Sequence, residues 1–151
     1  SCWNYFKKIL SFMKTTFKPK DLQLKVYVED TDFQGFVYHA NYIKFFERAR
    51  SEFLEYNNIS QKKLREENLV FVVKRIETNF LSPGSLGDAL AVKSLIEKKS
   101  NARLIFNQHI VDLNDTRELC NALVEVCLIN IKSKKPKPLP DDLLLLLNEE
   151  N

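Results

Sequence analysis

The sequence predicts one α+β domain in which a long helix packs against one face of an antiparallel sheet. One long segment repeats its apolar residues at helical spacing, and four long segments rich in β-branched and aromatic residues follow it, separated by short turns. With 151 residues, 44% of them hydrophobic, the chain is long enough for one domain with a real core and barely long enough for two. A further strand before the helix completes an expected five-stranded sheet.

The first 20 residues form a separate extension in this prediction. Their apolar residues recur at roughly helical spacing with lysines between them, which is typical of a short basic amphipathic helix. Such a helix can lie on an anionic membrane surface, or it can pack on its own domain or on a sister subunit, and the sequence leaves both possibilities open. The apolar positions are Trp3, Phe6, Ile9, Leu10, Met13 and Phe17.

The domain itself is expected over residues 21–140 and begins with a strand over Leu22–Val28, where apolar and polar residues alternate. The long helix is expected over His39–Tyr56, and Asn57 and Asn58 suit its C-terminal end. Ser60 is a good N-cap for a second, short helix. The apolar stripe of the long helix comprises Tyr42, Phe45, Phe46, Ala49, Phe53 and Leu54.

The second half of the domain is predicted to be strands only. Because the turns between the strands are short, consecutive strands are expected to be antiparallel neighbours. A tail over residues 141–151 contains a leucine run, Leu143–Leu147, expected to cover a sheet edge or a subunit contact as a short helix. An open sheet of this kind keeps a free edge, which favours pairing with another subunit. The expected strands span residues 69–80, 89–98, 102–113 and 119–131.

Composition excludes several classes of protein. A net charge of +3 is too small to suggest a nucleic-acid binder, and no apolar run approaches the roughly 20 residues that span a bilayer. Cys2, Cys120 and Cys127 have no metal-like spacing, and the last two fall in one expected strand. Reduced thiols in a cytoplasmic protein are therefore expected.

The segment YVEDTDFQGFVYHANYIKFFERAR, residues 27–50, carries more ionisable groups than a connecting loop needs. Together with VVKRIETNFLSPGSLGDALAV and the last two strands, it resembles the 4-hydroxybenzoyl-CoA thioesterase class of hotdog-fold enzymes. The resemblance covers roughly Leu22 to Pro140 and is greatest to the bacterial YbgC-type acyl-CoA thioesterases, which are associated with the Tol-Pal system. It implies a hotdog fold, in which the sheet wraps the long helix.

The resemblance also implies a site in this loop. Asp32 occupies the position of the family's catalytic carboxylate, which acts as a nucleophile or as a base for water. The backbone N–H of His39, at the start of the long helix, occupies the position of the group that polarises the thioester carbonyl, and the His39 side chain is often counted in the site. Substrate contacts are expected from Gly35, Val37, Tyr38, Asn41 and Tyr42. No metal or cofactor is implied, because coenzyme A is part of the substrate.

General chemistry supports these roles. A thioester carbonyl gains negative charge when attacked, and N–H groups at a helix start are oriented to stabilise that charge. A carboxylate such as Asp32 can attack, or activate water, without a metal. Gly35 lets the backbone approach a substrate closely or adopt a positive φ.

Other interpretations remain at several of these positions. Asp32 can simply cap a turn, while Asp30 is expected to be a turn acceptor and Glu29 a solvated or arginine-paired charge. Glu47 and the arginines that follow it are expected to form buried or inter-subunit ion pairs, because charges within an aromatic helix need partners. A hotdog dehydratase or hydratase would instead pair His39 with Glu47, which leaves Asp32 without a role. A third possibility is a non-catalytic membrane-associated or protein-binding module.

The family further implies an acyl-CoA substrate, with acyl carrier protein as a possible alternative donor, and a homo-oligomer, most often a tetramer built as a dimer of dimers. A cytoplasmic location, possibly at the inner-membrane surface through residues 1–20, is the corresponding expectation. The acyl pocket is expected to involve Phe33, Phe36, Tyr42, Phe45 and Phe46. Candidate partners for the phosphates of the coenzyme are Lys74, Arg75, Lys98, Lys99, Arg103, Lys132, Lys134, Lys135 and Lys137.

Overall fold

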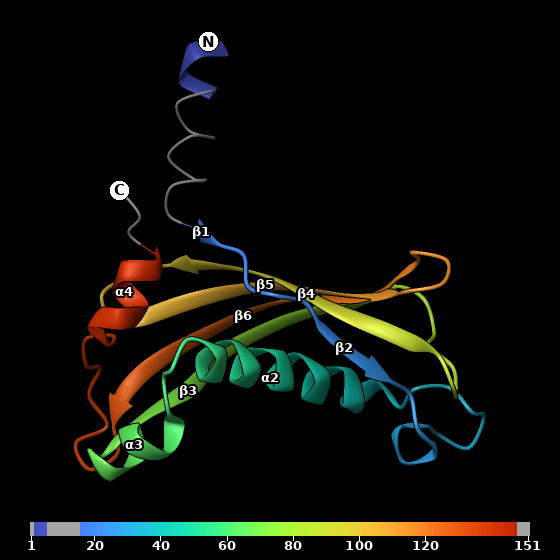
Figure 1. Cartoon of the computed structure of the whole chain (residues 1–151), viewed down its shortest axis with the longest axis horizontal. Coiled ribbons are helices and arrows are strands. Elements are labelled where there is room, and N and C mark those ends of the chain that lie inside the picture. Colours follow the sequence, from blue (N-terminus) through green and yellow to red (C-terminus); the bar gives the residue numbers. More distant parts are fainter. Residues whose placement is uncertain (1, 6–15, 148–151) are drawn as a thin grey trace.

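The computed structural model describes residues 2–5 and 16–147, and Figure 1 shows a curved sheet with one long helix along its inner face. Residues 2–5 are helical. The remaining elements, in chain order, are β1 (Thr16–Phe17), β2 (Leu22–Lys25), the 3-10 turn η1 (Val28–Asp30), α2 (His39–Tyr56), α3 (Gln61–Glu66), β3 (Leu69–Phe80), β4 (Ala89–Lys98), β5 (Arg103–Asp112), β6 (Glu118–Asn130) and α4 (Asp141–Leu147).

The sheet is antiparallel, with the order β1-β4-β5-β6-β3, and β2 also pairs with β4. β1 and β2 occupy different parts of the same edge, since Thr16 pairs with Glu97 and Leu22 pairs with Val92. The six strands therefore fill five positions across the sheet. This confirms the predicted α+β architecture and adds a short strand that the sequence did not indicate.

The expectation that all consecutive strands are neighbours is wrong for β3 and β4. β3 pairs with β6 along its whole length, from Leu69 opposite Asn130 to Phe80 opposite Cys120, and lies at the edge far from β2. Residues 81–88 therefore cross the end of the sheet. Eight residues can reach roughly 26 Å, whereas three strand spacings need only about 14 Å, so a short connection does not require adjacent strands.

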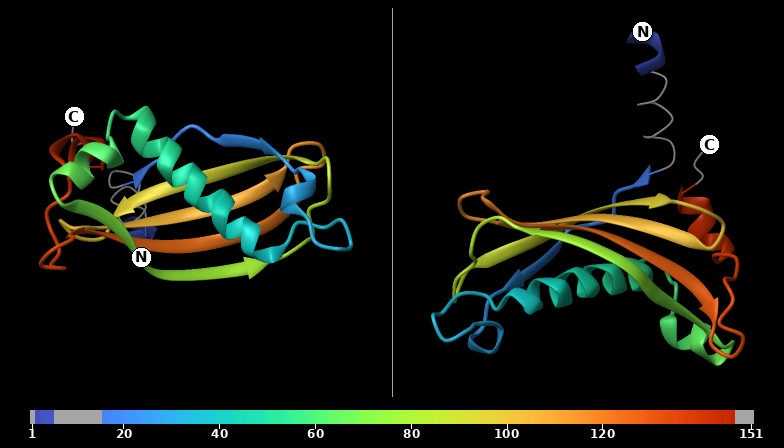
Figure 2. Two further views of the ribbon diagram at one scale, coloured as in Figure 1. Left: turned by 90° about the horizontal axis from the view of Figure 1, so that it is seen from below. Right: turned by 180° about the vertical axis from the view of Figure 1, so that it is seen from behind.

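Helix α2 has the bounds that the sequence predicts, and its apolar stripe is buried as expected. The helix packs against β2, β4 and β5, and the sheet curves around it (Figure 2). The ring of Phe53 lies 6.0 Å from that of Phe106 on β5 and 5.7 Å from that of Phe17 on β1. The capping predictions are also confirmed, because Ser60 Oγ accepts a hydrogen bond from Lys63 N at 3.2 Å, and Asn58 takes a φ of 62° after the helix.

The structure corrects two boundaries near the N-terminus. The helix expected over residues 1–20 does not extend to residue 20, because Thr16 and Phe17 are paired with β4 and Phe17 packs on α2. Residues 6–15 lie outside the described part of the chain. β2 ends at Lys25 rather than Val28, because Val26 leaves the ladder to exchange backbone bonds with Gly87 and Asp88 at 3.0 and 2.9 Å.

The C-terminal leucines form the expected short helix, α4. Leu143 and Leu147 are fully buried in the core, and the helix contacts β1 and β4, so it covers one edge of the sheet. Among the described residues, no helix is long and apolar enough to cross a membrane.

Candidate functional site

Residues 30–38 fold into a small hairpin directly before α2. Asp32 N donates to Phe36 O at 2.7 Å, Tyr38 N donates to Asp30 O at 2.9 Å, and Thr31 and Val37 form an isolated β-bridge between them. The tip turns back at Gly35, whose φ is +83°. A Cβ at that position would meet nothing within 4 Å, so the glycine serves the turn and not a close approach.

The carboxylate of Asp32 lies at the tip of this hairpin and is exposed. Its Oδ1 accepts hydrogen bonds from Gln34 N at 2.8 Å and Phe36 N at 3.2 Å. Asp32 is therefore a turn cap, which was the competing interpretation of this residue. The cap fixes the orientation of the carboxylate through Oδ1 and leaves Oδ2 without a partner among the described residues.

The first turn of α2 presents donors at the other end of the hairpin. Tyr38 is the N-cap residue, but its side chain makes no capping bond, and His39 N and Ala40 N have no acceptor within the described chain. Unpaired N–H groups at a helix start carry partial positive charge. The imidazole of His39 is exposed and lies with its centroid 4.6 Å from Tyr38 and 6.0 Å from Phe80.

The hairpin sets the spacing of these two groups. Asp32 stands opposite Phe36, and three residues of extended chain lead from Phe36 to His39, which corresponds to roughly 10 Å. The carboxylate and the helix start therefore lie at the two ends of one short, hydrogen-bonded element.

Asp30 holds the hairpin to the helix. It is buried, its Oδ2 accepts from Tyr27 N at 2.8 Å, and its carbonyl accepts from Asn41 Nδ2 at 2.8 Å. The expectation that Asp30 is a turn acceptor is confirmed, and Glu29 is exposed, as expected of a solvated charge. Asn41 is 9% exposed and uses its side chain for this internal bond, so it connects elements within the chain.

A second segment, residues 81–88, lies along the outer side of the hairpin. Val37 N donates to Gly84 O at 2.8 Å, Leu86 N donates to Gly35 O at 3.0 Å, and Phe36 forms a bridge with Ser85. The Tyr42 hydroxyl accepts from Gly84 N at 2.9 Å. Burial raises the pKa of Tyr42, while the hydrogen bond from Gly84 opposes that shift.

The contact at Gly84 leaves no room for a side chain. A Cβ there would stand 3.1 Å from Leu119 and Val37 and 3.3 Å from the Tyr42 hydroxyl. Val37 and Tyr42 are buried, so in this chain they support the hairpin from below rather than line an open surface. Two of the three glycines in the chain, Gly84 and Gly87, fall in the segment 81–88, which was expected only to be a short turn between strands.

Glu47 lies apart from this hairpin. It is eight residues beyond His39 on α2, which is roughly 12 Å along the helix axis. Its Oε1 accepts from Ser51 Oγ at 2.7 Å, and it takes part in no ion pair within the described residues. Among the described residues, the buried ion pairs expected for Glu47, Arg48 and Arg50 are thus not formed, and the inter-subunit pairs stay a prediction.

The two arginines have other partners. Arg48 lies over the ring of Phe45, with its Cζ 5.5 Å from the centroid. Arg50 is buried and donates from Nη1 to Gln108 Oε1 at 3.1 Å. Burial lowers the pKa of Arg50 below its ordinary value, and the charge of Glu47 opposes this.

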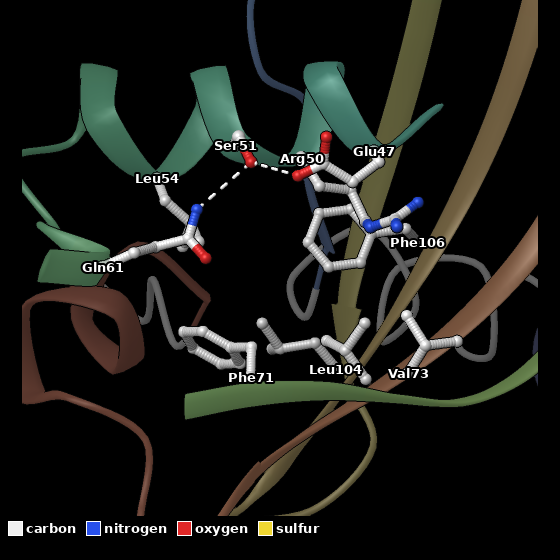
Figure 3. Close-up of a pocket in the computed structure, with 10 residues that line it drawn as sticks. Glu47, Arg50, Ser51, Leu54, Gln61, Phe71, Val73, Leu104 and Phe106 are labelled. Carbon is white, nitrogen blue, oxygen red and sulfur yellow. Dashed lines mark hydrogen bonds between the residues drawn. The ribbon is translucent and has the colours of Figure 1, made fainter. Parts of the chain in front are cut away.

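An apolar cleft of about 110 Å³ separates the middle of α2 from β3 (Figure 3). The carboxylate of Glu47, the hydroxyl of Ser51 and the amide of Gln61 form a hydrogen-bonded row along its helix side, as the dashed lines show. The volume is several times the roughly 10–15 Å³ that one water needs, so a small organic group fits. The lining residues are Glu47, Arg50, Ser51, Leu54, Gln61, Phe71, Val73, Leu104, Phe106 and Val126.

The aromatic residues expected around an acyl pocket are placed differently. Tyr42, Phe45 and Phe46 are buried in the core, and Phe33 is fully exposed at the hairpin tip. Within the single chain these side chains do not surround one pocket, because the stripe of α2 faces the sheet. Their contribution to an acyl pocket completed by a partner chain stays a prediction. Phe71 and Phe106, which do line the cleft, were not singled out from the sequence.

Comparisons with known proteins identify the family of the chain. Residues 26–147 match the model of the thioesterase-like superfamily. The chain is 37% identical over 121 residues to the acyl-CoA thioester hydrolase YbgC of Escherichia coli O6:H1, covering 80% of this chain and 90% of that protein. It is 38% identical over 120 residues to the acyl-CoA thioesterase YbgC of Haemophilus influenzae, covering 79% and 87%.

Solved structures extend the comparison to the fold. A probable thioesterase from Bartonella henselae is 42% identical, with a TM-score of 0.72, over 80% of this chain and 98% of that one. A 1,4-dihydroxy-2-naphthoyl-CoA thioesterase from Synechocystis is 22% identical and shares the fold, with a TM-score of 0.82 over 89% and 97%. The hotdog fold and the family resemblance are thereby confirmed: the chain belongs to the thioesterase-like superfamily.

Proposed function

We propose that this protein hydrolyses acyl-CoA thioesters to a free acid and CoA. One observation carries the proposal: the hairpin that precedes α2 holds an exposed, oriented carboxylate at one end and unpaired backbone N–H groups at the other. Membership of the thioesterase-like superfamily and identity to two acyl-CoA thioesterases support the same activity.

In the proposed mechanism the thioester carbonyl oxygen points at the start of α2, where the N–H of His39 stabilises the negative charge of the tetrahedral intermediate. One such donor is worth about 3 kcal/mol in the transition state. Asp32 takes a proton from water as the water oxygen bonds to the carbonyl carbon, and the C–S bond then breaks to release CoA thiolate. Alternatively, Asp32 attacks the carbon itself, and water hydrolyses the resulting anhydride.

The roles of the other candidates follow from their positions. Tyr38 and the His39 ring are exposed beside the helix start and are proposed to contact substrate, together with the backbone at Gly35. Val37, Asn41 and Tyr42 are proposed to support that surface. The dehydratase alternative needs His39 and Glu47 to act on one substrate, and their separation of roughly two helical turns within the chain does not favour it.

The activity test uses thiol release from short, long and aromatic acyl-CoAs. We expect Asp32→Asn to lower kcat by about two to four orders of magnitude, because the reaction loses its base or nucleophile. Glu29→Gln is the matched control, since Glu29 is an exposed carboxylate three residues away. If wild type releases no thiol from any member of the panel, or if Asp32→Asn keeps full activity, this assignment is wrong.

A single turnover in ¹⁸O-labelled water tests for a covalent anhydride. Label recovered in the Asp32 side chain indicates the anhydride, because water has then attacked its side-chain carbonyl carbon and left one oxygen on the aspartate. Label found only in the released acid is the result both of general-base catalysis and of attack by water on the acyl carbon of an anhydride.

We also propose that two chains pair through β3. This strand is 12 residues long, has β6 on one side and no strand on the other within the described chain, and exposes Val73, Ile76 and Phe80. Long unpaired edges with apolar side chains favour pairing with another strand. A dimer of dimers remains the proposed assembly, with no metal or separate cofactor.

The cellular location of the protein and the identity of the thioester donor are proposed from fewer observations. Cys2, Cys120 and Cys127 are free thiols, which suits a cytoplasmic enzyme. Contact of residues 1–20 with the inner membrane surface remains a proposal, as do a link to the Tol-Pal system and the use of acyl carrier protein as a donor. Liposome sedimentation with and without residues 1–15 tests the membrane contact.

A further inference from the structure

The connection between β3 and β4, residues 81–88, ends in a tight turn that Asp88 closes with both its backbone and its side chain. Asp88 N donates to Ser85 O at 3.0 Å. The carboxylate oxygen Oδ2 of Asp88 accepts from Ser85 N at 2.8 Å. Both backbone polar groups of Ser85 are therefore bound to Asp88, and the position of Ser85 depends on that residue.

The base of this turn is anchored to the sheet. Asp88 O accepts from Val26 N at 2.9 Å, and Val26 O accepts from Gly87 N at 3.0 Å, directly after β2. Val26 is fully buried in the core, and β4 begins at the residue that follows Asp88. Asp88 is thus a fixed point at the end of the sheet from which Ser85 is held.

The other side of the turn holds the tip of the hairpin that carries Asp32. Leu86 N donates to Gly35 O at 3.0 Å, and Phe36 forms a β-bridge with Ser85. Phe36 N donates to Asp32 Oδ1 at 3.2 Å, and Phe36 O accepts from Asp32 N at 2.7 Å. Phe36 therefore lies between Asp32 on one side and Ser85 on the other.

The orientation of the Asp32 carboxylate depends on this tip alone. Within the described part of the chain, its hydrogen bonds come from the backbone N–H groups of Gln34 and Phe36 and from no side chain. A shift of residues 34–36 would move both donors and release the carboxylate from its fixed orientation. Misplacing a reacting group by about 1 Å can lower a rate about a hundredfold.

We infer that Asp88 is a positioning residue for the proposed hydrolysis: its carboxylate holds Ser85, and Ser85 keeps the hairpin tip and the carboxylate of Asp32 in place. The inference rests on the proposed function. Asp88 takes no part in making or breaking bonds, and its effect on the reaction passes through Ser85 and Phe36. The competing interpretation is that Asp88 only stabilises the connection between two strands, in which case its loss would lower stability but not kcat.

Thiol release by Asp88→Ala tests the inference, with an acyl-CoA that the wild type hydrolyses. We expect kcat to fall about tenfold to a hundredfold, because Ser85 N loses its acceptor and the hairpin tip can move. KM should stay within about twofold, since Asp88 does not contact the substrate. Asp88→Asn should keep kcat within about threefold of the wild-type value, because its amide oxygen can still accept from Ser85 N.

Ser60→Ala is the matched control. Ser60 Oγ accepts from Lys63 N at 3.2 Å, so this substitution also removes one side-chain acceptor from a backbone N–H three residues away. Ser60 caps α3, and neither Ser60 nor Lys63 is hydrogen-bonded to the hairpin among the described residues. Both Ser60→Ala and Asp88→Ala should lower the melting temperature, whereas only Asp88→Ala should lower kcat. An equal loss of kcat in the two variants overturns the inference.

A double-mutant cycle shows whether Asp88 acts through Asp32. Asp32→Asn removes the reacting carboxylate, so adding Asp88→Ala to it should change kcat by less than about twofold. If Asp88→Ala lowers kcat by the same factor with and without Asp32→Asn, Asp88 acts elsewhere and the inference is wrong. Amide hydrogen exchange at Phe36 and Leu86 should be faster in Asp88→Ala than in the wild type. Unchanged exchange at both positions contradicts the inference as well.

Failure of the inference differs from failure of the proposed function. If Asp32→Asn loses turnover while Asp88→Ala keeps the wild-type kcat, or if Asp88→Asn loses as much kcat as Asp88→Ala, only the inference is wrong. If the wild type hydrolyses no acyl-CoA, or if Asp32→Asn keeps full activity, both are wrong. Should Asp88→Ala not fold, Asp88→Ser replaces it, because the serine oxygen is one bond closer to the backbone than the carboxylate oxygens. A wild-type kcat in that variant overturns the inference.

Discussion

The inner-face side chains of β5 and of the edge strand β3 differ in exposure, although the two strands are built from similar residues. On β5, beneath α2, Leu104, Phe106 and Ile110 are at most 2% exposed. On β3, Val73 is 48%, Ile76 36% and Phe80 52% exposed. The difference arises because α2 packs mainly against β2, β4 and β5, far from the edge strand β3.

This contrast shows how one chain can complete its core and still leave one edge strand of the sheet exposed. The covered part of the sheet provides stability through buried aromatic and aliphatic side chains. The exposed edge, β3, is where a second chain is proposed to bind. Substitutions in the covered part and at the exposed edge should therefore have different consequences.

The largest effect is expected at the open edge. Ile76→Asp should raise the dimer dissociation constant by about a hundredfold or more, because two unpaired carboxylates would enter the proposed interface. Sedimentation equilibrium measures this. Leu123→Asp is the control on the opposite face of the sheet, where Leu123 is 45% exposed. If Leu123→Asp gives monomers and Ile76→Asp leaves the assembly intact, the chains do not pair through β3.

In the covered part of the sheet, Gln108→Leu should destabilise the fold by about 2–3 kcal/mol. Gln108 is fully buried, and its loss removes the acceptor of Arg50 Nη1 and the donor to Ser94 Oγ, at 3.1 Å each. Urea unfolding gives the value. Ser94→Ala should cost under about 1 kcal/mol, since Gln108 Nε2 keeps Phe46 O as an acceptor at 3.1 Å. If Gln108→Leu and Ser94→Ala lowered the free energy of unfolding equally, the hydrogen bond to Arg50 would contribute nothing beyond the bond to Ser94.

Where α2 meets the segment between β3 and β4, Tyr42→Phe should cost about 1–2 kcal/mol, because Gly84 N would lose its buried acceptor. A fall in kcat smaller than that of Asp32→Asn should accompany this, since Gly84 holds Val37 of the hairpin. Thermal unfolding and thiol release measure the two effects. Tyr56→Phe serves as the control because Tyr56 is 74% exposed; a similar loss there would show that the hydroxyl of Tyr42 is not the cause.

The smallest effect is expected on the outer face, at the pair of His109 and Glu118. The hydrogen bond from His109 lowers the pKa of Glu118 below its ordinary 4.5, so the pair stabilises the fold above that pH. This stability is lost as the pH falls through the depressed folded value. Because the pair is largely exposed, the loss should be under about 1 kcal/mol. Melting curves recorded between about pH 6 and about pH 3 measure this loss. The melting temperature of Glu118→Gln should change less with pH than that of the wild type. The same pH dependence in both proteins would contradict the assignment.

Local patterns determined much of the fold. The 3.6-residue period of α2 and the alternation of β3 to β6 predicted those elements with the right bounds or within one residue, because amphipathic periodicity is a property of neighbouring residues. The serine cap of α3, the φ of Asn58 and the turn role of Gly35 were similarly local. The sequence also indicated the hairpin at Asp32 and the helix start at His39 as a site.

Only the tertiary structure decided which strands became neighbours and which side chains remained exposed. β3 pairs with β6 and not with β4, because the crossing over residues 81–88 is long enough to span the sheet end. The short strand at Thr16, the support of Val37 by Gly84 and the burial of Tyr42 all depend on segments far apart in the sequence. A residue's own neighbours cannot reveal whether it faces a helix, an open cleft or a free edge, and that arrangement decides the surface available for function.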